Sequence, residues 1–181
     1  MYHFEQACCE QIRFFRNKGT QMKTTIPAFQ QLIRNPIHLL AFGFGSGLLP
    51  KAPGTAGTIM GLLFWCLLAE LPLTSYLATV TIAALAGVYI CGKTASDLGV
   101  HDHGGIVWDE MVGLWLALTI IPVSWTWVLA GFLIFRLFDI WKPWPISWLD
   151  KNIIGGLGIM LDDLVAGALT WLVLFLTIKI L

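Results

Sequence analysis

The sequence predicts an all-α integral membrane protein, a bundle of about four to five transmembrane helices with a short re-entrant or interfacial helix. Hydrophobic residues make up 57% of the 181 residues and charged residues only 12%, whereas soluble domains carry about 25% charged residues. Apolar stretches near the length of a bilayer span recur along the chain. The formal net charge is zero and no basic run is present, so we expect no nucleic-acid partner.

The first 34 residues are predicted to form a polar tail on the cytoplasmic side, or a short helix lying on the membrane surface. They are mildly basic and lack the continuous apolar stretch of a cleaved signal peptide. Residues 35–181 are then expected to form one membrane-embedded domain.

Five apolar stretches follow the tail, at residues 56–71, 75–92, 106–123, 125–141 and 159–181. A spanning helix needs about 20 residues, so the first and third stretches are marginal. A sixth stretch, IHLLAFGFGSGLLP at 37–50, is short and interrupted by glycine. We expect a re-entrant or interfacial segment there.

The connections between these stretches predict the orientation. Residues 71–74 and 122–124 are short, uncharged connections, whereas the other connections carry lysines. Cytoplasmic loops are enriched in Lys and Arg, so the tail and the charged connections are expected inside, with Lys179 as one exception. The ionisable motifs then gather at the cytoplasmic end of the bundle, which favours a site there over a pathway across the membrane.

Two pairs of adjacent carboxylates lie near the starts of two apolar stretches, Asp109 with Glu110 and Asp162 with Asp163. Neighbours on a helix are rotated by about 100°, so one member of each pair can face the bundle. Carboxylates also complement the positive end of a helix dipole, which is the alternative role. Two such pairs at one membrane face favour metal binding, and clustered oxygen ligands suit Mg²⁺.

Three basic residues complete the predicted site. Arg136 and Asp139 are three residues apart and can share a helix face, and Lys142 follows. Arg136 could neutralise Asp139 within the membrane, or Arg136 and Lys142 could hold an anionic substrate while Asp139 binds a metal; both can be true. Lys51 lies between two prolines ahead of a glycine-rich helix start, where an anion could bind, although no Walker-A motif is present.

Other chemistries find little support. His101 and His103 flank Asp102, but no third His or Cys lies nearby to complete a zinc site, so turn formation or proton transfer is favoured. The four cysteines show neither a C-x-x-C pair nor a thiolate phosphatase loop, and we expect small buried hydrophobes. Because G-x-S-x-G and Asp-x-Asp motifs are also missing, metal-assisted attack by water remains.

Four segments together resemble the phosphatidylglycerophosphatase A family of bacterial membrane phosphatases: NPIHLLAFGFGSGLLPKAPGTAGT, DLGVHDHGGIVWDEMVG, FRLFDIWKPWPI and GGLGIMLDDLVAG. The resemblance runs from about Asn35 to the C-terminus. It implies a Mg²⁺-dependent phosphomonoesterase of the bacterial inner membrane. Such an enzyme converts the membrane phospholipid phosphatidylglycerophosphate to phosphatidylglycerol and inorganic phosphate in the cytoplasmic leaflet, a step of phospholipid biosynthesis.

We therefore assign roles to eight residues, from their chemistry and from the family motifs in which they lie. The predicted catalytic residues are Asp109, Glu110 and Asp163; the predicted Mg²⁺ ligands are Asp109, Glu110, Asp139, Asp162 and Asp163; the predicted substrate-binding cations are Lys51, Arg136 and Lys142. The alternative is a small membrane transporter or cation-binding protein that uses the same carboxylates. The chain argues against it, because no internal repeat and no charge cluster at the membrane midplane is visible.

Overall fold

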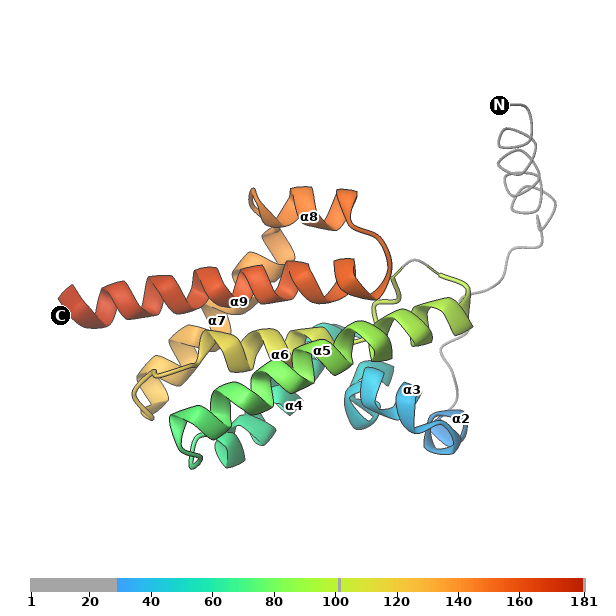
Figure 1. Cartoon of the computed structure of the whole chain (residues 1–181), viewed down its shortest axis with the longest axis horizontal. Helices are drawn as coiled ribbons and strands as arrows, with labels where there is room; N and C mark the ends of the chain where they lie inside the picture. The colour runs from blue at the N-terminus through green and yellow to red at the C-terminus, as the bar shows by residue number, and fades with distance from the viewer. Residues whose placement is uncertain (1–28, 101, 181) are drawn as a thin grey trace.

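The computed structural model describes residues 29–100 and 102–180, and this part of the chain is helical throughout (Figure 1). The predicted tail up to residue 28 and His101 lie outside the described residues. The elements are α2 Phe29–Arg34, α3 Pro36–Ala41, the 3-10 helix η1 Gly43–Leu48, α4 Pro53–Leu68, α5 Leu73–Leu98, α6 Trp108–Ala117, α7 Trp125–Trp141, α8 Ile146–Asn152 and α9 Gly155–Ile180.

Two of these helices, α5 and α9, are long and apolar enough to cross a membrane, with 26 residues each. At 1.5 Å per residue each helix is about 39 Å long, which exceeds the ~30 Å hydrocarbon thickness of a bilayer. Helix α4 is apolar but shorter, at 16 residues. The all-helical class is thus confirmed, and the count of four to five transmembrane helices stays a prediction.

The third predicted stretch, residues 106–123, is not one continuous helix. Helix α6 has only 10 residues and ends at Ala117, which gives a length of about 15 Å. Ile120 adopts a left-handed backbone with φ of 60°, and Pro122 follows without an N–H to continue a helix. Helix α6 is almost wholly buried and packs against α4, α5, α7 and α9. It is a half-length helix enclosed by protein.

The long helices begin and end at different residues from those predicted. Helix α5 continues past residue 92 to Leu98 and ends at Gly99, whose φ of 68° suits a glycine cap. Helix α9 begins at Gly155 rather than at residue 159. Asp162 and Asp163 therefore lie about two turns inside α9 instead of at its start.

The helices α4, α5, α6, α7 and α9 run up and down in alternation (Figure 1). The connections that follow η1, α5 and α7 lie at one end of the bundle, and the short connections at 69–72 and 118–124 lie at the other. This arrangement agrees with the alternation in the sequence of connections with and without Lys, and the connection at 69–72 carries one acidic residue, Glu70. The side of the membrane that each end faces stays a prediction.

The segment 37–50, predicted to be re-entrant or interfacial, forms α3 and η1 at the end that carries the charged connections. Asn35 caps α3 by accepting a hydrogen bond from the Ile37 N–H (3.1 Å). The backbone then turns sharply at Gly43, Phe44 and Gly45, all with positive φ. The short, glycine-broken character of the segment matches the expectation, and its depth in a bilayer stays a prediction.

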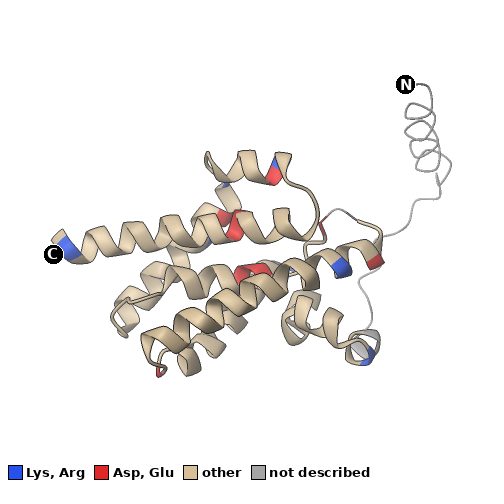
Figure 2. Cartoon of the chain, in the orientation of Figure 1, with Lys and Arg blue, Asp and Glu red and all other residues tan. Residues whose placement is uncertain are grey.

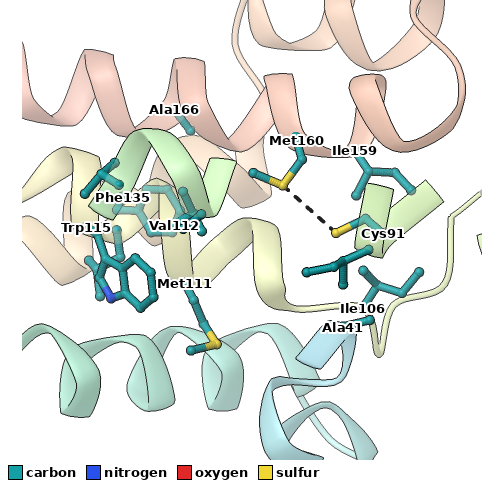
Figure 3. Packing of buried hydrophobic residues seen from close by; sticks show 14 of the residues in the cluster. Ala41, Cys91, Ile106, Met111, Val112, Trp115, Phe135, Ile159, Met160 and Ala166 are labelled. Carbon is teal, nitrogen blue, oxygen red and sulfur yellow. Dashed lines mark hydrogen bonds between the residues drawn. The ribbon is translucent and has the colours of Figure 1, made fainter. Parts of the chain in front are cut away.

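The core is built around α6 (Figure 3). Met111 and Val112 of α6 are fully buried with Phe135 of α7 and Met160 of α9. The Cys91 thiol of α5 lies 4.0 Å from the Met160 sulfur, as expected for a small buried hydrophobe.

Other side chains face outward. Cys66 is exposed, so the expectation of burial is wrong for this cysteine. Large apolar side chains on the outer faces of α4, α5, α7 and α9 are also exposed, as suits a surface in contact with lipid.

Candidate active site

The packing of α6 against α9 brings the two carboxylate pairs together. Asp109 and Glu110 occupy the first turn of α6, and Figure 2 shows the acidic segments of α6 and α9 at neighbouring levels of the bundle. The helices approach closely because Gly113 faces the Asp163 carbonyl oxygen, and a Cβ at Gly113 would lie only 2.7 Å from that oxygen. The sequence prediction that both pairs share one end of the bundle is consistent with this arrangement.

A buried ion-pair network joins α6 to α7. The Arg136 guanidinium donates to Glu110 Oε1 (3.1 Å) and to Asp139 Oδ2. Each of the three side chains is only 13% exposed. The Arg136–Asp139 ion pair that the sequence allowed is therefore present. Arg136 also donates to the Thr58 hydroxyl of α4 (3.4 Å).

A second network joins α7, α8 and α9. The Lys142 ammonium donates to Asp150 Oδ1 and to Asp162 Oδ2, each at 2.7 Å. Burial lowers the pKa of Lys142, but the two carboxylates outweigh it and hold the pKa above its ordinary value, so the ammonium stays protonated at neutral pH. Asp162 Oδ1 accepts the Asp163 N–H (3.0 Å). The Asp150 contact was missed in the sequence analysis, because eight residues separate Asp150 from Lys142.

Three buried carboxylate oxygens lack a hydrogen-bond partner among the described residues: Asp109 Oδ1, Glu110 Oε2 and Asp163 Oδ1. Asp109 is 7% exposed and Asp163 3%. Both are close enough to neighbouring carboxylates to be repelled by them. A buried ionised carboxylate without a partner is costly, so this part of the protein is set up to receive positive charge.

The donor chemistry of the cluster fits a divalent cation. Arg136 pairs with Glu110 and Asp139, and Lys142 pairs with Asp150 and Asp162. Asp109 and Asp163 lie close enough to other carboxylates of the cluster to be repelled by them. Within 29–100 and 102–180, no three Asp, Glu, His or Cys side chains already converge as metal ligands. Mg²⁺ keeps several waters and needs only one or two direct carboxylates. One or two of the orphaned carboxylate oxygens, together with waters, would therefore suit Mg²⁺.

The three predicted substrate-binding cations differ in availability. Arg136 and Lys142 are already paired with carboxylates. Lys51 is exposed, just ahead of α4, and forms no hydrogen bond or ion pair with any other residue that the structure describes. Lys51 is thus the cation among the three that is free to contact a phosphate.

Two glycines of the glycine-rich start of α4, which the sequence analysis considered only as a place where an anion could bind, shape the same region. A Cβ at Gly54 would collide with Glu110 Oε1 and lie 3.0 Å from the Arg136 guanidinium. A Cβ at Gly57 would lie 2.9 Å from Glu110 Oε2. The first turns of α4 therefore pack directly on the Glu110–Arg136 pair, and only glycine leaves room for it.

The histidines have structural partners. His103 Nδ1 accepts the Gly105 N–H (3.0 Å), and its ring lies 5.5 Å from the Phe42 ring. This agrees with a turn-forming role, whereas His101 lies outside the described residues. The sequence analysis missed His38, whose Nε2 lies 3.0 Å from Asp97 Oδ2 and ties α3 to the end of α5.

Comparison with known proteins agrees with the family resemblance seen in the sequence. Residues 39–178 match the family model described as Phosphatidylglycerophosphatase A. The chain is 55% identical over 137 residues to phosphatidylglycerophosphatase A of Escherichia coli strain K12, covering 75% of this chain and 80% of that protein. It is 51% identical over 146 residues to the protein of the same name from Haemophilus influenzae, covering 78% and 88%. No solved structure matches the chain significantly.

Proposed function

Because this chain belongs to the phosphatidylglycerophosphatase A family and is therefore a phosphoric monoester hydrolase, we propose that it hydrolyses the terminal phosphate of phosphatidylglycerophosphate with the aid of Mg²⁺. The products are phosphatidylglycerol and inorganic phosphate. The reaction takes place at the cytoplasmic face of the bacterial inner membrane, where the phosphate of a bilayer lipid reaches the carboxylate cluster.

The observation that carries this proposal is the set of buried carboxylate oxygens without partners on Asp109, Glu110 and Asp163. These three residues would hold Mg²⁺, with Asp139 beside them. Asp162 was also predicted as a ligand, but both of its oxygens already accept hydrogen bonds. Each carboxylate oxygen has a second lone pair, so Asp162 could keep these hydrogen bonds and still bind Mg²⁺.

Mg²⁺ held by these residues would lower the pKa of a water and would offset charge on the phosphate. The residues of the chain do the rest. The Asp163 carboxylate would accept the proton of the attacking water with the oxygen that does not bind Mg²⁺, and Lys51 would orient the phosphate from the start of α4. Arg136 and Lys142 keep the carboxylates in place and balance part of their charge.

The test is phosphate release from phosphatidylglycerophosphate by the protein purified in mild detergent, first with Mg²⁺ and then with a chelator. Release that requires Mg²⁺ and is not seen with soluble glycerol 3-phosphate supports the proposal. Absence of release from a folded preparation contradicts it and favours the transporter or cation-binding alternative. In that case lipid extracts of a strain lacking the protein would not accumulate the phosphorylated lipid.

A further inference from the structure

The contact between Lys142 and Asp150 links helix α8 to the candidate active site. Helix α8 packs alongside the beginning of α9 (Figure 1), and its Ile146 side chain is fully buried. The Lys142 ammonium bridges the two helices, 2.7 Å from Asp150 Oδ1 of α8 and 2.7 Å from Asp162 Oδ2 of α9. Asp150 is thus joined to the carboxylate cluster through Lys142.

The backbone at Lys142 indicates that this bridge has a function. Lys142 directly follows α7 and adopts a left-handed conformation, with φ of 44°. Glycine is the usual residue at such a helix end, because other residues adopt this conformation only at an energetic cost. The chain instead has a lysine there, and its side chain joins two other helices. Backbone conformations of this kind concentrate at functional sites.

The bridge leaves a net negative charge beside the cluster. One ammonium is shared by two carboxylates, so it cannot neutralise both. The Asp162 side chain is only 10% exposed, whereas that of Asp150 is 40% exposed, so water solvates Asp150 far better. If Lys142 paired with Asp162 alone, the ammonium would cancel the charge of that carboxylate and weaken its attraction for a cation. Asp150 opposes this by holding Lys142 from the other side.

We propose that Asp150 is a positioning residue for the metal site: it shares Lys142 with Asp162 and so leaves the Asp162 carboxylate available to a divalent cation. Residues that contact a metal ligand without touching the metal are known to tune metal affinity. This inference rests on the proposed function, because it requires Mg²⁺ to bind at the cluster. It extends that function to α8, which carries none of the predicted ligands.

The first experiment measures binding of Mn²⁺, a paramagnetic substitute for Mg²⁺, to the full chain in mild detergent by electron paramagnetic resonance. Asp150→Asn should raise the Kd for Mn²⁺ by about tenfold, as expected when a metal ligand loses an outer partner. Asp150→Glu keeps the negative charge and should restore the wild-type Kd. An Asp150→Asn variant with the wild-type Kd would overturn the inference.

Asp97→Asn is the matched control. Asp97 is also a partly exposed carboxylate paired with a lysine, Lys93, but both residues lie on α5 and neither contacts a carboxylate of the cluster. Its removal changes the net charge by the same amount, so the Kd for Mn²⁺ should stay at the wild-type value. An equal rise of the Kd in Asp97→Asn would show a general effect of net charge and would contradict a specific role for Asp150.

A second comparison tests whether Asp150 acts through Lys142. Lys142→Met keeps much of the packing of the lysine stem and removes the ammonium. In that background Asp150→Asn should cause no further change in the Kd for Mn²⁺, because the shared partner is gone. The same rise of the Kd as in the wild-type background would mean that Asp150 acts directly on the cation, and would overturn the positioning role.

Turnover separates the failure of this inference from the failure of the proposed function. Asp150→Asn should raise the Mg²⁺ concentration for half-maximal phosphate release by about tenfold, and added Mg²⁺ should restore turnover. A loss of turnover that Mg²⁺ does not restore would overturn the inference. A wild-type protein that binds Mn²⁺ and releases phosphate without any dependence on Asp150 leaves the function intact. A wild-type protein that binds no Mn²⁺ removes the metal site and the inference together.

Discussion

Arg136 of α7 links its own helix to two others. It donates a hydrogen bond to Thr58 of α4 and forms ion pairs with Glu110 of α6 and with Asp139 of α7. Removing one partner of a buried ion pair leaves an uncompensated charge. We therefore expect Arg136→Gln to lower the free energy of unfolding by about 3 kcal/mol or more, as well as to abolish activity. Thermal unfolding in detergent measures the first effect. A variant as stable as the wild-type protein would show that the network does not hold these helices together.

Lys51 should behave differently, because it is exposed and has no partner among the described residues. Lys51→Gln is expected to raise the KM for the lipid substrate by about tenfold, which is the loss of one charge-assisted hydrogen bond to phosphate. Its thermal stability should match that of the wild-type protein. An unchanged KM would remove Lys51 from substrate binding.

The residue types of the site could be predicted from the sequence, and their partners could not. The two carboxylate pairs can be recognised in the sequence, because each is a local pattern near the start of an apolar stretch. In the structure, Asp109, Glu110 and Asp163 lie in one charged cluster. The Lys142 contact to Asp162 joins residues 20 apart in the chain, and the Arg136 contact to Glu110 joins residues 26 apart. Such contacts depend on how the helices pack, which no spacing rule encodes.

At the scale of the helices, α6 and α9 depend on glycine for their close approach. A Cβ at Gly113 would lie 2.7 Å from the Asp163 carbonyl oxygen and 2.9 Å from the Phe135 ring. Gly113→Ala should therefore lower the free energy of unfolding by about 1–3 kcal/mol through overpacking, and it should reduce activity by moving Asp163. Gly104→Ala is the control, because no atom lies within 4 Å of a Cβ there. Similar stability of the two variants would contradict this reading of the interface.

The end of α6 is the element that the sequence analysis described least well. The hydropathy pattern predicts one continuous stretch over residues 106–123. Hydropathy carries no information about backbone conformation, and Ile120 adopts a left-handed conformation that ends the helix. A β-branched residue is disfavoured in that conformation. Since Ile120 is also 66% exposed, replacing it with glycine removes little packing.

Ile120→Gly is therefore expected to raise the free energy of unfolding by about 1 kcal/mol, the strain that the isoleucine carries. Val123→Gly, at another exposed apolar position beyond the end of α6 but without a positive φ, should not stabilise the protein. Thermal unfolding of the two variants in the same detergent makes the comparison. Destabilisation by Ile120→Gly would mean that α6 continues further than the structure shows.

At the scale of the whole molecule, the half-length helix α6 explains how charged groups can lie within an apolar bundle. Its first turn carries Asp109 and Glu110, and the longer helices around it enclose that turn. Backbone that does not span the membrane is tolerated at depth only where protein encloses it. The bundle thus holds a charged site near one end while its outer surface stays apolar, which is what hydrolysis of a lipid phosphate without removal of the lipid from the membrane requires.

The central claim is that the carboxylates brought together by α6 and α9 form the Mg²⁺-dependent phosphatase site. The most direct measurement compares phosphate release from phosphatidylglycerophosphate by the wild-type protein, Asp163→Asn and Glu70→Gln over a range of Mg²⁺ concentrations. Glu70 is an exposed carboxylate in the turn beyond the far end of α4, so its variant should match the wild-type protein. The account predicts no turnover by a folded Asp163→Asn variant at any Mg²⁺ concentration. Wild-type turnover by that variant would show that the cluster is not the site of the reaction.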